Sequence, residues 1–308
     1  MVSCENIFVD EKNWLASEYY IHSINPDGTE NEEIVQLDFY PGKIEVSSDG
    51  QKLLAYGSDQ YLFINLINNT INPLNTNNSN HYPKPTFSHD SSKLVFTKQN
   101  KLMLHDIYIN ETDSLICTGV DGYAVFSPND EYIIFTTSDV DGSNYLKSLK
   151  RIKTDGSGLI TLFSYINDSY PRTTICSPIF SSTGKLYFIA NGTLHNINLD
   201  GSNHQDFNIE MKSKSIDISP NGDLIIGIDS YDYLLLISFD GMDFYPLYSG
   251  ENAKFISNQR LVYSKSNVDL RVGEWDGSES NKLIRGRFPT YCDLMNKIYY
   301  LHVKEIYE

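Results

Sequence analysis

Two short segments carry oxygen ligands or glycines at spacings used in metal or phosphate binding. Asp139 and Asp141 alternate ahead of Gly142, as in the first half of a calcium loop, where hard oxygen ligands surround Ca²⁺. A third ligand and a distal bidentate glutamate are missing, so we interpret this segment as a hairpin turn. Residues 156–158 read Gly-Ser-Gly, but no helical pattern follows them, and we expect no phosphate cradle there.

Histidines and cysteines are scattered along the chain. No two of the seven histidines have the close spacing of a preformed metal site, and the four cysteines contain no C-x-x-C pair. We therefore expect buried thiols, no metal site and no cofactor. One alternative stays open, in which histidines far apart in sequence converge around a central channel. The histidines are His22, His81, His89, His105, His195, His204 and His302.

Motifs of common enzymes are absent from the sequence. No G-x-S-x-G nucleophile elbow occurs, and neither does a P-loop or a G-x-G-x-x-G dinucleotide fingerprint. These absences favour a protein that is not an enzyme.

Composition indicates a folded, strand-rich and acidic chain. Of its 308 residues 40% are hydrophobic and 13% aromatic, and the formal net charge is −16. A nucleic-acid binder usually has a basic face and an anionic membrane attracts clusters of Lys and Arg, so neither partner is expected. No apolar run approaches the roughly 18 residues of a transmembrane helix. We expect a monomer.

The first four residues leave two compartments open. Small residues precede Cys4, as at the end of a bacterial lipoprotein cleavage site, although no apolar stretch stands before them. Cys4 is therefore a candidate lipidation site in a periplasmic or cell-envelope protein whose signal segment is missing from this sequence. Otherwise the protein is expected in the cytoplasm.

Two families of turns alternate along the chain with a period of roughly 40 residues, which is typical of four-stranded propeller blades. The first is an Asp-Gly or Asn turn that favours a tight hairpin. It occurs at 25–29, 68–69, 110–111, 154–157, 199–202, 239–242 and 275–278. The second is of the Ser-x-Asp-Gly type and precedes a short apolar run. It occurs at 47–50, 88–91, 127–130, 181–184, 219–222, 257–259 and 293–296.

Seven turns of each family predict an all-β chain folded as one β-propeller of seven four-stranded blades, with six blades as the alternative count. The chain starts and stops midway through a blade. We therefore expect strands near 297–303 to pair with strands near 18–37 in a composite blade, which removes the open edge of the ring. Residues 1–16 are expected to be a lead-in and 17–308 the propeller.

Residues 127–142 read Ser-Pro-Asn-Asp-Glu-Tyr-Ile-Ile-Phe-Thr-Thr-Ser-Asp-Val-Asp-Gly, and 153–158 read Lys-Thr-Asp-Gly-Ser-Gly. This pattern resembles the repeat of TolB-like, WD40-like propellers, and degraded copies cover nearly the whole chain. The resemblance implies a propeller and envelope-associated protein binding. TolB-like propellers most often have six blades, so the count of seven departs from that pattern.

The resemblance also implies where a ligand would bind. In such propellers the loops entering the innermost strand and those joining the second and third strands share one face, around the channel mouth. Two loops of this kind stand out, at 75–85 and 164–177. The candidate ligand-binding residues on this face are Tyr82, Asp139, Asp141, Tyr170, Arg172, Tyr231 and Asp232.

Two functions follow as hypotheses. The first is a non-catalytic binding or scaffold propeller that recognises a protein, peptide or glycan through this face. The alternative is a metal-assisted carbohydrate-active enzyme, a lyase or hydrolase with its site at the channel mouth.

Overall fold

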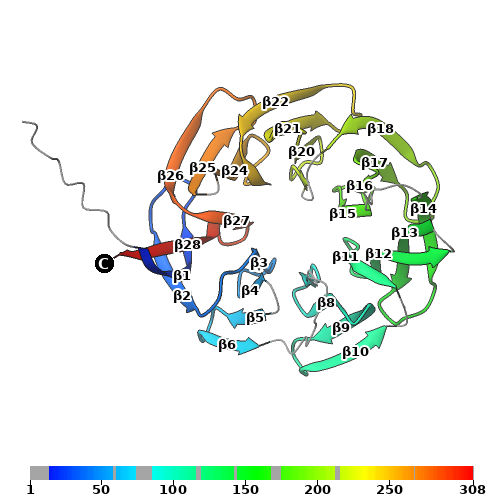
Figure 1. The fold of residues 1–308 in the computed structure, drawn as a ribbon, viewed down its shortest axis with the longest axis horizontal. Coiled ribbons are helices and arrows are strands. Elements are labelled where there is room, and N and C mark those ends of the chain that lie inside the picture. The colour runs from blue at the N-terminus through cyan, green and yellow to red at the C-terminus, as the bar shows by residue number, and fades with distance from the viewer. Residues whose placement is uncertain are drawn as a thin grey trace, which may run out of the picture.

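The computed structural model describes residues 14–57, 60–73, 85–115, 119–141, 144–167, 175–211, 216–266 and 268–307. Within these ranges it has 28 strands and no helix, and therefore none that could cross a membrane. The strands form seven four-stranded antiparallel sheets arranged in a ring (Figure 1). The protein is a seven-bladed β-propeller, which confirms the predicted blade number and rules out the alternative count of six.

Six blades are continuous in sequence and run from an inner to an outer strand. Blades 1 to 3 comprise β3 (Lys43–Val46), β4 (Lys52–Gly57), β5 (Gln60–Asn65) and β6 (Thr70–Pro73); β7 (Thr86–Phe87), β8 (Lys93–Lys98), β9 (Lys101–Asp106) and β10 (Glu111–Leu115); and β11 (Val120–Phe126), β12 (Tyr132–Asp141), β13 (Asn144–Lys153) and β14 (Ile160–Asn167). Blades 4 to 6 comprise β15 (Ile175–Phe180), β16 (Leu186–Ala190), β17 (Thr193–Ile197) and β18 (Gln205–Glu210); β19 (Asp217–Ile218), β20 (Leu224–Ile228), β21 (Tyr233–Ser238) and β22 (Phe244–Ser249); and β23 (Glu251–Phe255), β24 (Arg260–Lys265), β25 (Asp269–Glu274) and β26 (Ser280–Arg285).

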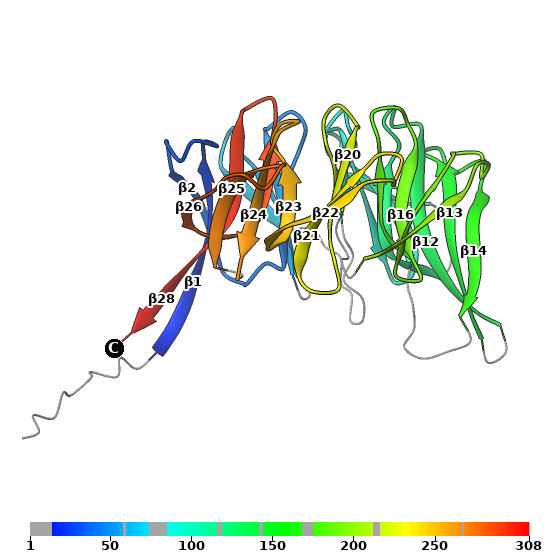
Figure 2. The same cartoon turned by 90° about the horizontal axis from the view of Figure 1, so that it is seen from above.

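Blade 7 is the predicted composite blade. Its strands from the channel outward are β27 (Arg287–Cys292), β28 (Lys297–Tyr307), β1 (Trp14–Ile24) and β2 (Glu32–Leu37). The β1–β28 register extends from Trp14 opposite Tyr307 to Ile24 opposite Ile298, and the far end of this pair projects beyond the ring (Figure 2). The boundary predicted at residue 16 stays a prediction, because residues 1–13 lie outside the described part.

Seven apolar clusters fill the spaces between neighbouring blades. Each draws side chains from two blades, as where Tyr187 of blade 4 packs in one cluster with Ile225 of blade 5. Cys176 and Cys292 are buried thiols within two of these clusters. Because every blade packs against both neighbours, burial of apolar surface stabilises the ring as a whole.

The Ser-x-Asp turns join the first two strands of a blade through a buried hydroxyl. In blade 3 the Ser127 hydroxyl accepts a hydrogen bond from the Tyr132 backbone N–H at 2.9 Å and donates one to Asn129 at 2.8 Å. The fourth turn residue, Asp130, has a φ of 56°, in the left-handed region that Gly, Asn and Asp tolerate. The turn therefore needs a serine to bond the backbone N–H and a fourth residue that tolerates a positive φ.

The same turns connect neighbouring blades. The Asp130 carboxylate accepts the backbone N–H groups of His89 and Asp90, from the turn of blade 2, at 2.8 and 2.9 Å. Asn258 of blade 6 likewise accepts the Asn221 N–H of blade 5 at 2.9 Å. These bonds fix one turn against the next around the ring.

Both turn families lie on one face of the ring. The Ser-x-Asp turns join the first and second strands, and the Asp-Gly or Asn turns join the third and fourth strands. Since the strands alternate in direction, the remaining connections lie on the other face. We term the two faces the turn face and the mouth face.

Replacing Ser127 by Ala is expected to lower the free energy of unfolding by about 1–3 kcal/mol, because the part-buried Tyr132 N–H loses its acceptor. Ser202→Ala is the control, because its hydroxyl lies in an exposed turn, and it should cost less than about 0.5 kcal/mol. Urea unfolding of both variants measures the difference. Equal losses would show that the Ser127 hydroxyl has no special structural role.

Stability is expected to fall as the pH drops from 7.5 to 5.5. Burial lowers the pKa of His22, His105 and His195, so these rings bind protons less readily in the fold than in the unfolded chain, which binds them below about pH 6.5. The proximity of His302 lowers the pKa of His22 further. Thermal melts across this range measure the effect, and His22→Gln should make the dependence shallower. A constant melting temperature would contradict this expectation.

Candidate functional site

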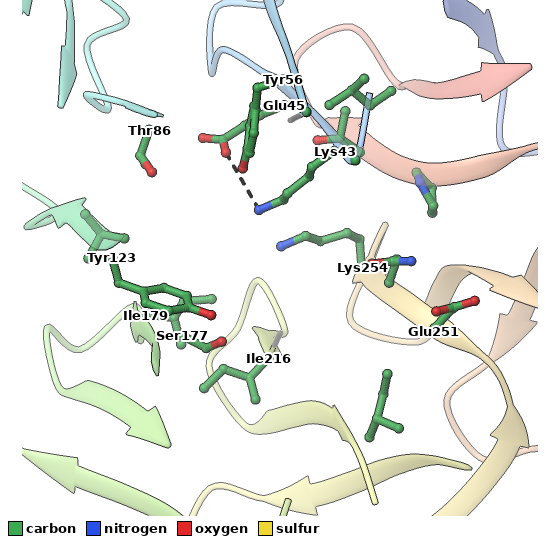
Figure 3. Close-up of a pocket in the computed structure, with 18 of the residues that line it drawn as sticks. Lys43, Glu45, Tyr56, Thr86, Tyr123, Ser177, Ile179, Ile216, Glu251 and Lys254 are labelled. Carbon is green, nitrogen blue, oxygen red and sulfur yellow. Dashed lines mark ion pairs between the residues drawn. The ribbon is translucent and has the colours of Figure 1, made fainter. Parts of the chain in front are cut away.

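A cavity of about 870 Å³ occupies the central channel, with residues of all seven blades in its lining (Figure 3). Gly57 and Ile228 end the second strands of their blades, and Asp232 lies in the connection from a second to a third strand, so the cavity opens on the mouth face. A narrower cavity of about 240 Å³ continues toward the turn face, where Ser48 and His89 line it.

The lining of the large cavity is divided into two sides. Blades 2 to 5 contribute an apolar side, on which Tyr123, Ile179 and Ile216 lie near one another in Figure 3. Blades 5, 6 and 1 contribute the charged side chains. These are Lys43, Glu45, Asp232, Glu251 and Lys254.

Both ammonium groups of the channel have carboxylate partners. The Lys254 Nζ lies 2.9 Å from a carboxylate oxygen of Asp217, whose other oxygen accepts the Phe255 N–H at 2.7 Å. The Lys43 Nζ lies 3.9 Å from Glu45 (Figure 3). The positive charge of the channel is therefore balanced within the protein.

Two carboxylates on the mouth side lie close enough to influence each other. Burial, and next the neighbouring Asp232, raise the pKa of Glu251, while Arg287 opposes this shift. Arg287 also donates a hydrogen bond to the Tyr40 hydroxyl at 3.0 Å, and Tyr40 lines the cavity. This edge of the channel carries two negative groups followed by an arginine and an aromatic ring.

Two buried hydroxyls in the cavity lining have no hydrogen-bond partner among the described residues. Tyr56 is 6% exposed and Ser177 is 9% exposed. Burial, followed by the nearby Glu45, raises the pKa of Tyr56 well above its usual range, so its hydroxyl remains a neutral donor. A buried polar group without a partner costs about 1–3 kcal/mol, which a ligand that pairs with it would recover.

Bulges in four innermost strands bring polar groups to this level of the channel. In β11, β15, β23 and β27 the pairing register shifts beside a residue of positive φ. These residues are Gly122, Ser177, Asn252 and Phe288. A bulge inserts one extra residue and re-aims the side chains around it, which explains how Ser177 and Asn252 come to line the cavity.

Of the residues predicted from sequence, Asp232 lines the cavity. Tyr231 precedes it on the same connection and is 79% exposed. Asp139 lies toward the mouth face on β12, and its carboxylate is 3.7 Å from Lys150, outside the cavity lining. Asp141 ends β12, and the structure does not describe its side chain.

Four other predicted residues, Cys4, Tyr82, Tyr170 and Arg172, lie outside the described residues. Sequence reasoning did not name Lys43, Tyr56, Ser177 or Lys254 as site residues, although Ser177 ends the candidate loop 164–177. Of these four, only Ser177 could have been recognised as unusual from the sequence. Pro178 follows it within a strand pattern, and proline within a sheet indicates an edge strand or a bulge.

Among the described residues, no three His, Cys, Asp or Glu side chains are grouped so that they could hold a metal ion. Two histidine pairs do form. His195 and His204 nitrogens lie 3.0 Å apart in blade 4, and the His22 and His302 rings lie 5.0 Å apart in blade 7. None of these four lines the channel cavity.

A seven-bladed ring around a lined channel defines the structural class of this protein. No protein-family model and no curated protein matches the sequence. The fold is similar to that of a chain from Agrobacterium tumefaciens assigned as TolB, with a TM-score of 0.57 and 13% identity, covering 95% of this chain and 100% of the other. It is also similar to an oligogalacturonate lyase in complex with manganese (TM-score 0.63, 12% identity, 93% and 91% covered).

A chain of a nidogen–laminin complex is a third similar structure, with a TM-score of 0.54 and 10% identity, covering 75% of this chain and 94% of the other. At these identities the likeness establishes the propeller fold alone. A chain from a protein complex and an enzyme both occur among the similar structures, so the function has to be argued from the site.

Tyr56→Phe is expected to raise the free energy of unfolding by up to about 1 kcal/mol, because it removes a buried hydroxyl that has no partner. Tyr300→Phe is the matched control, since the buried Tyr300 donates to Asn31 at 2.7 Å, and it should lose about 1 kcal/mol. Denaturant unfolding compares the two variants. Destabilisation by Tyr56→Phe would show that this hydroxyl is already bonded in the ligand-free protein.

Proposed function

We propose that this protein is a TolB-like binding propeller that recognises a protein, peptide or glycan with the channel cavity on its mouth face. The observation that carries the proposal is the pair of buried hydroxyls, Tyr56 and Ser177, that line this cavity without partners. Folded proteins pair nearly all buried polar groups, so such a pair favours a site completed by a ligand.

The chemistry of the described lining favours binding over catalysis. A serine nucleophile needs a base within hydrogen-bonding distance, and Ser177 has no such partner among the described residues. A metal-assisted lyase or hydrolase would need several ligands gathered from different blades. It remains the alternative against which the binding function is tested.

An envelope location belongs to the same proposal. TolB-like propellers associate with the cell envelope, and Cys4 would provide a lipid anchor if the mature protein began there.

Thr86→Trp is expected to abolish ligand binding, because Thr86 lines both cavities and an indole there would occupy space where the two cavities adjoin. Met242→Trp is the control, since Met242 is 81% exposed on a turn-face connection, and it should bind like the wild type. Each immobilised variant is used to capture ligands from an extract of the source cells, after equal melting temperatures show that both are folded.

Equal capture by the two variants would contradict a channel site. In parallel, the wild-type protein is screened by thermal shift against divalent metals and acidic or neutral oligosaccharides. A ligand present at 100 times its Kd stabilises by about 2.7 kcal/mol. A metal-dependent shift that a chelator reverses would support the enzyme instead.

A further inference from the structure

Both lysines of the channel cavity lie beside carboxylates. The Lys43 Nζ lies 3.9 Å from a Glu45 carboxylate oxygen, and the Lys254 Nζ lies 2.9 Å from one of Asp217. In each pair the carboxylate offsets the charge of the lysine, so neither pair presents a net charge to a ligand.

A third group of charges lies on the mouth side of the cavity. Burial and the neighbouring Asp232 raise the pKa of Glu251, and Arg287 opposes this shift, so the guanidinium offsets part of the negative charge. Asp232 has a further interaction within the protein. Three cations and four carboxylates thus lie in or beside the cavity, a difference of one charge. An ion of either sign would gain little Coulomb energy here and would lose its hydration, which favours an uncharged ligand.

Hydroxyl groups reach the cavity from several blades. Tyr56 of blade 1, Thr86 of blade 2 and Ser177 of blade 4 line it from different directions (Figure 3). The hydroxyls of Tyr56 and Ser177 are buried and have no hydrogen-bond partner among the described residues. Because a hydroxyl both donates and accepts, these groups suit a ligand that carries hydroxyls of its own.

The inner strands of the blades offer little regular edge to an extended peptide. A peptide that adds to a sheet needs a continuous row of free backbone N–H and C=O groups. Bulges interrupt β11, β15, β23 and β27, while β7 and β19 have two residues each and β3 has four. The described strands therefore favour a compact ligand with polar groups on several sides over an added strand.

The apolar side of the cavity gives such a ligand a second kind of contact. Tyr123, Ile179 and Ile216 lie near one another there (Figure 3). A sugar ring has apolar C–H groups on its faces and hydroxyls at its edge, so it can pack against this side while its hydroxyls form hydrogen bonds. A volume of about 870 Å³ is that of a pocket for a ligand of about two to four sugar rings.

We infer that the channel binds an uncharged oligosaccharide. Its hydroxyls pair with those of Tyr56 and Ser177, and the C–H face of a sugar ring packs against Tyr123 and Ile179. This inference rests on the proposed function, because it gives the channel site a defined class of ligand.

The probes are unlabelled tetrasaccharides, among them two matched pairs that differ in charge. One pair is chitotetraose and its deacetylated, cationic form, and the other is cellotetraose and its C6-oxidised, anionic form. Uncharged tetramers of mannose, galactose and xylose complete the sugars, and a pool of uncharged random nonapeptides is titrated in parallel. Isothermal titration calorimetry measures binding at low and high salt.

We expect at least one uncharged tetramer to bind with a Kd below about 1 mM, at least tenfold more tightly than either charged tetramer. Salt should change this Kd less than twofold, because no charge of the ligand is screened. Tighter binding of a charged tetramer or of the peptide pool, or binding of no sugar, would overturn the inference.

Tyr56→Phe and Ser177→Ala should each weaken binding of the uncharged sugar by about threefold to tenfold, because each removes one hydrogen bond to the ligand. Tyr245→Phe is the control, since it removes the same hydroxyl from a ring that is 54% exposed on the outer strand β22, and it should change the Kd less than twofold. Unchanged sugar affinity in both cavity variants would contradict the inference.

Two outcomes separate this inference from the proposed function. If the peptide pool binds, Thr86→Trp abolishes this binding and no sugar binds, the channel is the site but the class of ligand is wrong. If a sugar binds equally to the wild type and to Thr86→Trp, the channel is not the site and both proposals fail.

Discussion

The ring is closed by the antiparallel pairing of β1 with β28, which aligns Trp14 with Tyr307 and Ile24 with Ile298. This pairing brings blade 7 against blade 1 and completes the seventh apolar cluster. The channel cavity depends on the same closure, because its charged side chains come from blades on both sides of the joined ends. Local backbone hydrogen bonds in one blade thus hold in place a site built from seven blades.

The two faces of the ring are under different constraints. On the turn face, buried serine hydroxyls and left-handed residues satisfy the backbone, and bonds such as those from Asp130 connect adjacent turns. Any replacement there has to preserve these bonds. On the mouth face, the connections vary in length and sequence, and Asp232 and Glu251 lie together despite their like charge. Groups arranged at some cost to stability are expected where a protein meets its ligand.

The sequence predicted those features that depend on residues close together along the chain. Ser127 and Tyr132 are five residues apart, so their turn could be recognised by its residues, and the alternation of turns predicted seven blades and the composite blade. Asp232 could be placed on the mouth face from its position in the repeat. Lys254 and Tyr56 could not be assigned to one cavity, because they line it from different blades of the closed ring. The direction in which a bulge turns the Ser177 hydroxyl is likewise set by packing that the sequence does not display.

The composite blade has a topological consequence. Trp14 and Tyr307 are paired neighbours, so a short loop from residue 307 to residue 14 would correspond to the connection between second and third strands in every other blade. The backbone could then be opened at another mouth-face connection, and the order of the blades around the axis would be unchanged. A circularly permuted chain would therefore form the same seven blades around the same channel.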